Sequence, residues 1–390
     1  MEISVAVVEP VGGHGGMNIY DAGLCRGLLL AGARVSFYTC DETVDPAIPG
    51  LLFCPVYRGI YGRGARWIRA LRYLIGSLGM AWNAVRRGET SVHFHVFGGA
   101  ATELCNILLA KLFGRTVVLT IHDVESLARP AAMGRGIIRR VYGLAGRLIV
   151  HNQTSREELI ERLGIDATKI SVIPHGNYLE MTRHVPSPTE ARRALGIEDT
   201  KKVILFFGQI KEVKGIDLLI EALPAIASEV PEALLVIAGR PWKTDFSRYA
   251  TLIDTMGVRD RCLVHLEYVP DDQVPLYYAA ADVVVLPYRR IYQSGVILLA
   301  MSYGKVVVAS DLPGMREVVV DGENGYLFAR ESKDALAKTL VRALQGQRER
   351  AEIEARALQY VRRSHDWNQI GVKTVQLYRD LLSRPEQPSG

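Results

Sequence analysis

The sequence predicts two α/β domains of the doubly wound type, each with a parallel sheet covered by helices on both faces. Short apolar, β-branched runs alternate with amphipathic helical stretches along most of the chain. These runs are nearly continuous in hydrophobicity, as is typical of strands buried on both faces. A length of 390 residues also favours two domains over a single hydrophobic core.

The alternation occurs in two series separated by an interruption. Strands are expected at Ile3–Val8, Arg34–Tyr38, Ser91–Val96, Thr116–Ile121, Arg147–Val150 and Ile170–Ile173, and then at Val203–Phe207, Leu234–Ala238, Cys262–His265, Val283–Leu286 and Val306–Ala309. The segment His184–Thr200, which is rich in proline and serine near its start, is predicted to be the linker or its near flank. We therefore expect an N-terminal domain at 1–183, a C-terminal domain at 184–365, and a helix within 366–390; the pattern leaves open whether this helix returns to the first domain.

The bulk composition favours a reduced, cytoplasmic protein without a nucleic-acid partner. The net charge of +5 is small for this length, and the five cysteines are scattered and form no CxxC pair. No signal peptide or membrane-spanning run is recognised, so contact with a membrane is expected only at its surface.

Two loops of the first domain contain candidate ligand-binding residues. The loop Gly12-Gly13-His14-Gly15-Gly16 follows the first strand, where glycines let a backbone approach an anion closely; a plain tight turn is the alternative. His122 and Asp123 follow the fourth strand, where they suit a polar substrate, or else His122 caps the next helix. His93 and His95 share one face of a strand, but no third ligand supports a metal site.

Three loops of the second domain together predict a pocket for a nucleotide diphosphate. The loop Gly208–Gly215 carries Lys211 and Lys214 before a helix, a pattern that suits a phosphate group unless these lysines are simply solvated. In the second loop, Ser294-Gly295 begins a helix that faces the same anion. In the third, Glu317 lies near a helix start, where it either satisfies the helix dipole or accepts ribose hydroxyls.

These loops, in this order, resemble glycosyltransferase family 4, the retaining enzymes with two Rossmann-like domains facing across a cleft (the GT-B fold). The resemblance covers nearly the whole chain. It rests on Gly12–Gly16, Thr120-Ile121-His122-Asp123, Val172-Ile173-Pro174-His175-Gly176-Asn177, Phe207-Gly208 through Lys214-Gly215, Gln293-Ser294-Gly295 with Leu299-Ala300-Met301, and Leu312 through Glu317.

The resemblance implies roles for individual residues. His122 would contact the transferred sugar near its 6-position and Lys214 would bind the diphosphate, so both are candidate catalytic residues. The implied donor-binding set is Gly15, Gly16, Gly208, Gln209, Lys211, Lys214, Gln293, Ser294, Gly295, Val296 and Glu317; His14, Asp123, His175 and Asn177 would lie on the acceptor or sugar side.

The chain departs from the family pattern at two places. Gln209 stands where many members have arginine, and Lys211 is expected to supply that charge by analogy. The family's paired glutamates would fall near Arg290 or Ile291 and at Leu299, so neither is acidic. The chain therefore resembles a subgroup with Gln-Ser-Gly in this loop, in which ribose binding depends on Glu317.

The expected activity is metal-independent transfer of a hexose, with retention, from a UDP- or GDP-sugar to a saccharide or lipid-linked saccharide. No DxD metal motif stands at a strand end, and no cofactor is expected. The alternatives are a non-catalytic partner subunit, an epimerase or a phosphorylase on the same fold; a nicotinamide dehydrogenase is disfavoured because GxGxxG is absent.

A basic amphipathic stretch from Tyr57 to Arg87 indicates where a membrane would bind. It contains no acidic residue, and Arg66, Trp67, Arg69 and Arg72 are the membrane-facing candidates. We expect a peripheral enzyme of bacterial surface-polysaccharide assembly at the inner face of the cytoplasmic membrane. The alternative is a core-facing helix with a solvated basic side.

Overall fold

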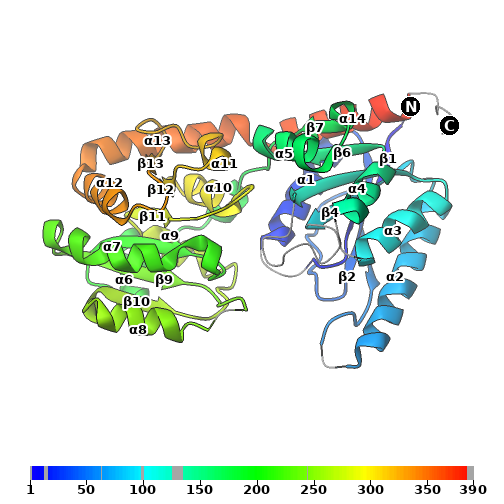
Figure 1. Cartoon of the computed structure of the whole chain (residues 1–390). Helices are drawn as coiled ribbons and strands as arrows, with labels where there is room; N and C mark the ends of the chain where they lie inside the picture. The colour runs from blue at the N-terminus through cyan, green and yellow to red at the C-terminus, as the bar shows by residue number, and fades with distance from the viewer. Residues whose placement is uncertain are drawn as a thin grey trace. The chain divides into compact units, whose positions relative to one another are not determined.

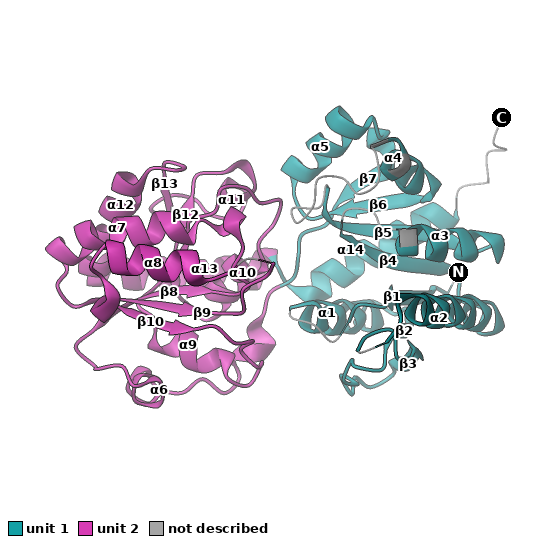
Figure 2. Ribbon diagram, turned by 60° about the horizontal axis from the view of Figure 1, so that its bottom comes forward, with its two compact units in different colours: residues 1–176, 365–390 teal, residues 177–364 magenta. Residues whose placement is uncertain are grey.

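The computed structural model describes residues 2–12, 16–62, 64–97, 101–124, 135–243 and 245–383. The chain forms two compact units, one of residues 1–176 and 365–390 and the other of residues 177–364 (Figure 2). The sequence placed the boundary later, after residue 183. The C-terminal helix belongs to unit 1, because it packs along the first helix of the chain.

Unit 1 is built on a seven-stranded parallel sheet with the order β3-β2-β1-β4-β5-β6-β7 (Figure 1). The chain leaves β1 toward β2 and β3 on one side and then returns to β4 on the other side, so the strand order reverses between β1 and β4. The strands are β1 Ser4–Glu9, β2 Arg34–Cys40, β3 Leu52–Tyr57, β4 Ser91–Phe97, β5 Thr116–Asp123, β6 Arg147–Val150 and β7 Ile170–Val172.

The helices of unit 1 follow the predicted alternation, and β3 is the strand that the pattern missed. β3 contains Pro55, which lowers strand propensity, and it forms an edge of the sheet, where proline is tolerated. The helices are α1 Met17–Leu30, α2 Arg66–Arg86, α3 Ala101–Leu112, α4 Arg135–Leu144, α5 Gln153–Leu163 and α14 Trp367–Leu382, with a 3-10 turn at Ala167–Lys169.

Unit 2 repeats the architecture with six parallel strands in the order β10-β9-β8-β11-β12-β13. Its strand order reverses between β8 and β11. The prediction of two doubly wound α/β domains is therefore confirmed; the three-residue strand β13 was not foreseen. The strands are β8 Lys202–Phe207, β9 Ala233–Ala238, β10 Cys262–His265, β11 Val283–Leu286, β12 Val306–Ser310 and β13 Tyr326–Phe328.

The segment His184–Thr200, expected as the linker or its near flank, contains a helix that the sequence-based interpretation did not identify. Ser187 caps α6: its hydroxyl accepts a hydrogen bond from the Glu190 amide, while the Glu190 carboxylate accepts one from the Ser187 amide, and Pro188 occupies the first turn. The helices of unit 2 are α6 Pro188–Leu195, α7 Ile216–Glu229, α8 Ser247–Thr255, α9 Val274–Ala280, α10 Gly295–Ser302, α11 Pro313–Arg316, α12 Lys333–Gln345 and α13 Gln347–Ser364, with 3-10 turns at Leu179–Thr182, Glu212–Lys214 and Arg259–Arg261.

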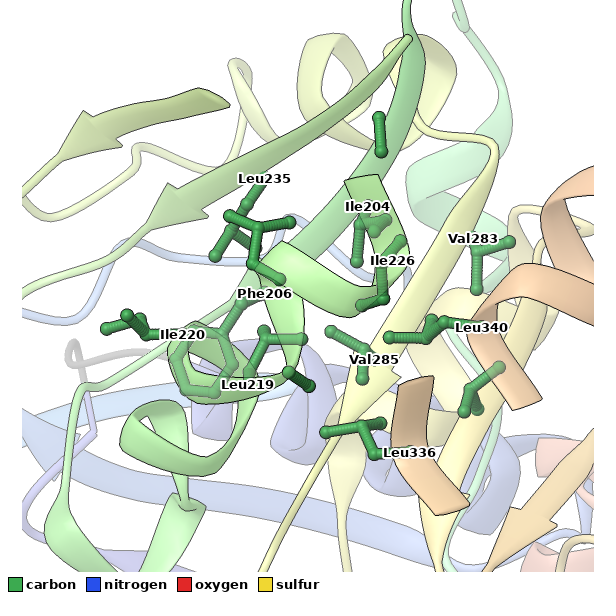
Figure 3. Close-up of a cluster of buried hydrophobic side chains, with 14 of the residues drawn as sticks. Ile204, Phe206, Leu219, Ile220, Ile226, Leu235, Val283, Val285, Leu336 and Leu340 are labelled. Atoms are coloured by element: carbon green, nitrogen blue, oxygen red, sulfur yellow. The ribbon is translucent and has the colours of Figure 1, made fainter. Parts of the chain in front are cut away.

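One face of the second sheet forms the core drawn in Figure 3. Alternate residues of a strand point to the same face, so Ile204 and Phe206 of β8 lie beside Val283 and Val285 of β11. Helices α7 and α12 cover this face with buried leucine and isoleucine side chains: Leu219, Ile220, Ile226, Leu336 and Leu340. This packing fixes the carboxyl ends of β8 and β11, where the candidate donor loops begin.

In unit 1, α1 and α14 cross at glycines. A Cβ on Gly371 would stand 2.0 Å from the carbonyl oxygen of Gly27, and a Cβ on Gly27 would stand 2.2 Å from that of Trp367. The Trp367 ring lies against Gly23 and Gly176, where a Cβ would approach it to 2.2 and 2.1 Å. The C-terminal helix is therefore attached by backbone-to-backbone and ring-to-backbone contacts that leave no room for a side chain.

We predict that Gly371→Ala destabilises the protein by about 1–3 kcal/mol, because the obstructing atoms are backbone and move only if the helices separate. Gly79→Ala is the matched control, since Gly79 lies inside α2 and its added methyl group meets no atom within 4 Å. The free energy of unfolding of the control should rise by up to about 1 kcal/mol, because alanine has a higher helix propensity than glycine. Denaturant unfolding of both variants tests this; equal stability would mean that the two helices do not cross this closely.

Candidate functional site

The candidate donor loops lie where the strand order of the second sheet reverses. In doubly wound sheets this point opens a crevice outside the carboxyl ends of the strands, and ligands bind there. Gly208 ends β8 with φ +100°, a conformation that favours glycine. Ser294 and Gly295 follow β11 and begin α10. The two loops are neighbours because β8 pairs with β11.

Lys214 brings its ammonium group to this junction. A Cβ on Gly208 would lie 3.2 Å from Lys214 Nζ and 3.6 Å from Val296 Cγ2, so these groups meet over the end of β8. The ammonium group also lies 5.3 Å from the centre of the buried Tyr288 ring. Burial lowers the pKa of Lys214 from 10.5 to about 8. A desolvated cation held beside exposed backbone is suited to an anionic ligand.

A set of contacts fixes the backbone around Lys214. A Cβ on Gly215 would stand 2.0 Å from Pro287 O, and Gly215 has a φ of +64°, so the position requires glycine twice over. The Arg289 amide donates to Val213 O at 2.8 Å. The Arg289 guanidinium makes a bidentate pair with Asp217 at 2.9 and 2.7 Å. Arg289 thus ties the two donor loops together, a role that the sequence did not reveal.

The start of α10 provides further polar groups. Gln293 Nε2 is buried and, in the part of the chain that the structure describes, has no hydrogen-bond partner, although buried amide groups are nearly always paired. Ser294 precedes the helix without a side-chain cap, so the first amides of α10 are not capped by its hydroxyl. A Cβ on Gly295 would lie 2.5 Å from Tyr178 Oη, so the Tyr178 side chain packs directly against this glycine.

Three other donor-site candidates lie at the margins of these loops. Gln209 is exposed, and Lys211 Nζ lies 5.7 Å from the centre of the Trp242 ring. Glu317 is exposed at the end of α11, and its backbone oxygen accepts a hydrogen bond from Tyr360 at 3.2 Å. Helix α11 adjoins the second loop, because a Cβ on Gly314 would stand 2.6 Å from Tyr292 O.

In unit 1, His122 and Asp123 end β5, as the sequence predicted. His122 is 9% exposed; its ring stacks on Phe97 at 4.8 Å between centres, and its Nε2 is 3.0 Å from His95 Nδ1. Burial, together with neighbouring histidines, lowers the pKa of His122 well below its usual value, so the ring is neutral near pH 7. Gly16 caps α1, whereas His14 and Gly15 lie outside the described residues.

His175 and Asn177 occupy the position where the chain passes from unit 1 to unit 2. The His175 ring packs edge-on to Tyr20 at 4.8 Å between centres, and its carbonyl oxygen hydrogen-bonds His365 Nδ1 at 2.6 Å. Asn177 Nδ2 donates to Val361 O at 3.3 Å. The contacts of His175 and Asn177 thus connect the segment near residue 176, where the chain leaves unit 1, to the segment near residue 364, where it returns.

Tyr20 is the centre of a histidine cluster. Its ring contacts those of His95, His122, His151 and His175 edge-on. Among the described residues no group of three or more histidine, cysteine or acidic side chains is arranged to hold a metal ion. Nor does that part of the chain contain a helix with the length and hydrophobicity to cross a bilayer.

Family models match both halves of the chain. Residues 14–180 match "Glycosyltransferase Family 4", and residues 187–360 match "Glycosyl transferases group 1". A solved structure, Anabaena HepE in complex with UDP-glucose, superposes with a TM-score of 0.76 at 19% identity over 97% of this chain and 100% of that one. At this identity the match shows the fold, which is GT-B.

Two full-length relatives complete the comparison. An uncharacterized glycosyltransferase of Methanocaldococcus jannaschii is 32% identical over 94% of this chain and 94% of its own. The D-inositol 3-phosphate glycosyltransferase of Xylanimonas cellulosilytica is 29% identical over 96% of this chain and 93% of its own. With both halves matched by family models and a relative above 30% identity along nearly the whole length, the chain belongs to the family 4-like glycosyltransferases of the GT-B fold.

Proposed function

We propose that this glycosyltransferase moves a hexose, with retention and without a metal ion, from a UDP- or GDP-sugar to a saccharide or lipid-linked saccharide in bacterial surface-polysaccharide assembly. The observation that carries the donor site is the half-buried Lys214 ammonium group at the junction of β8 and β11. A nucleotide diphosphate fits this position because its negative charge would pair with the half-buried ammonium group. HepE, whose fold this chain shares, was solved with UDP-glucose.

Departure of the nucleotide diphosphate leaves negative charge on its phosphate while the sugar gains positive charge. A preorganised cation in a water-poor site stabilises that charge without a reorganisation cost. Lys214 supplies the cation, and the first amides of α10 supply partial positive charge. These groups perform the role that a divalent ion has in metal-dependent transferases, and for this reason we propose metal independence.

The neutral ring of His122 suits hydrogen bonding to a sugar hydroxyl better than it suits proton abstraction. Leu299, at the position of the family's second glutamate, is buried within α10 and offers no polar contact. Binding of the sugar therefore depends more on unit 1 in this chain than in members that carry the glutamate pair. The same absence favours the second candidate function, a non-catalytic partner subunit.

Helix α2 supports a membrane-associated acceptor. Its buried face consists of small residues and Met80, whereas its opposite face carries exposed large apolar side chains over about 27 Å of helix. Exposed fractions on this face reach 69% at Trp67, 60% at Ile75 and 61% at Trp82. The face, called here the α2 stripe, is formed by Trp67, Leu71, Leu74, Ile75, Leu78, Trp82 and Val85.

The charge around the α2 stripe favours an anionic lipid surface over a second copy of the chain. Arg66, Arg72 and Arg86 are exposed along the helix, and the sequence from Tyr57 to Arg87 contains no acid. Two copies of this face would bring like charges together, whereas anionic headgroups would neutralise them while the apolar side chains enter the interface. Arg69 is half-buried, and its Nε has no hydrogen-bond partner within the described residues.

We predict that Lys214→Met lowers donor turnover about 10²–10³-fold, because one preorganised contact to the leaving phosphate is lost. The same change should raise the thermal midpoint of the ligand-free protein, since it removes a desolvated charge. Release of nucleoside diphosphate from UDP-glucose and GDP-mannose measures the first effect, and differential scanning fluorimetry the second.

Lys338→Met, an exposed lysine on α12, is the matched control and should change neither quantity. The pH dependence follows from the same group: Lys214 is protonated below its pKa of about 8, so UDP affinity should fall as pH rises through and beyond that value. Full turnover by Lys214→Met would refute the donor site. No turnover of any donor by the wild type would favour the partner subunit.

We predict that His122→Ala slows nucleotide release from a hexose donor about tenfold and leaves release from the 6-deoxy analogue unchanged. The reason is that only the hexose has the hydroxyl that His122 binds. Rates with UDP-glucose, GDP-mannose and their 6-deoxy analogues test this, with the exposed His184→Ala as control. An equal loss with both donors would place His122 away from the 6-position.

We predict that the protein binds vesicles containing phosphatidylglycerol but not pure phosphatidylcholine vesicles. Replacing Leu74, Ile75 and Leu78 with Gln should abolish binding, because the α2 stripe loses its apolar centre. The Arg66→Glu and Arg86→Glu pair should weaken it by about 1 kcal/mol per residue or more. Leu108→Gln with Leu112→Gln, exposed on α3, is the control. Unchanged co-sedimentation of the triple variant would rule out the α2 stripe as the lipid-binding surface. If the wild type formed concentration-dependent dimers and the triple variant did not, the stripe would instead bind a second copy of the chain.

A further inference from the structure

A chain of buried polar side chains lies behind His122. His95 on β4 places its Nδ1 3.0 Å from His122 Nε2, and its Nε2 lies 3.5 Å from Asp21 Oδ1 on α1. Asp21 is fully buried and His95 is 4% exposed. Asp21, His95 and His122 therefore form a row that leads from the interior of unit 1 to the carboxyl end of β5.

The inner half of this row is not explained by packing alone. Both carboxyl oxygens of Asp21 are buried and have no hydrogen-bond partner among the described residues, and the same is true of His95 Nε2. The 3.5 Å contact between them is at the outer limit of a hydrogen bond, yet it is the polar contact available to each. Leaving such groups unpaired costs roughly 1–3 kcal/mol, so their mutual orientation calls for a function.

At the outer end of the row, one ring nitrogen of His122 is available to bind a ligand. In the part of the chain that the structure describes, the hydrogen bond to His95 is the one that His122 makes. It uses Nε2, which leaves Nδ1 for a ligand. In a neutral imidazole one ring nitrogen carries the proton and the other is an acceptor. The partner on Nε2 therefore decides whether His122 Nδ1 donates or accepts.

The protonation of Asp21 sets the direction of the whole row. Burial, reinforced by the nearby Glu9 carboxyl, raises the pKa of Asp21 well above its usual value, while burial lowers the pKa values of His95 and His122. A protonated Asp21 donates to His95 Nε2, and His95 Nδ1–H then donates to His122 Nε2. The proton of His122 consequently resides on Nδ1, which becomes a hydrogen-bond donor. An ionised Asp21 would reverse every donor and acceptor in the row.

We propose that Asp21 and His95 are positioning residues that keep the proton of His122 on Nδ1, so that His122 donates a hydrogen bond to a hydroxyl oxygen of the transferred sugar. This inference rests on the proposed role of His122 in sugar binding. It assigns a task to two residues that are buried behind His122. It also specifies the ligand atom: an oxygen that accepts a hydrogen bond.

The direct test is ¹⁵N NMR of the full chain labelled at histidine, with His122 assigned by loss of its signals in His122→Gln. We expect the wild type to show a protonated Nδ1 and an unprotonated Nε2 at His122. Asp21→Asn should preserve this pattern, because an amide N–H also donates to His95 Nε2, whereas Asp21→Leu should change it. A wild-type His122 protonated on Nε2, or a pattern unaffected by Asp21→Leu, would overturn the proposal.

Kinetics distinguish positioning from a purely structural role. His95→Phe should slow nucleotide release from a hexose donor about tenfold, as His122→Ala does, and leave release from the 6-deoxy analogue at the wild-type rate. Asp21→Asn should rescue the hexose rate that Asp21→Leu loses. Equal losses with both donors would show that His95 acts only through the fold. Because the NMR experiment needs no turnover, an inactive wild type would refute the proposed function without obscuring this inference.

Discussion

A half-buried ammonium group at the end of β8 is the constraint on which the donor site depends. Lys214 loses hydration there without gaining a carboxylate partner from the described residues, and burial accounts for its lowered pKa. The backbone around Lys214 is fixed in position, because Gly208 and Gly215 adopt positive φ and the Arg289–Asp217 pair joins the two loops. This arrangement costs stability in the free protein, and a bound diphosphate offsets that cost by pairing with the charge.

Unit 1 has neutral polar groups in its candidate site, in contrast to the charged Lys214 of unit 2. Its site is lined by histidines whose pKa values are lowered by burial, so it presents neutral hydrogen-bonding groups instead of charge. This division suits the proposed chemistry, because the phosphate needs a cation whereas a sugar hydroxyl needs oriented donors and acceptors. The aromatic ring of Tyr20 contacts four imidazoles of this unit edge-on, those of His95, His122, His151 and His175.

The strands and the main ligand loops were predictable because their signals are local. Continuous apolar runs identify β8 and β11, and the lysines and glycines that follow mark Lys214 directly. Helix α6 was missed because its capping box was not recognised, and β3 was missed because its proline lowers the strand signal of an edge strand. The Arg289–Asp217 clamp and the Asp21–His95 contact could not be inferred, because each joins residues far apart in sequence that only the folded sheet brings together.

The most direct test of the account is calorimetric titration of the wild-type protein with uridine, UMP and UDP, and with the matching guanosine series. If Lys214 and the start of α10 hold the diphosphate, affinity should rise steeply with each phosphate, and the diphosphate of the preferred base should bind at least about 100-fold more tightly than its nucleoside, a difference of about 2.7 kcal/mol. Equal affinity for nucleoside and diphosphate in both series would contradict the account.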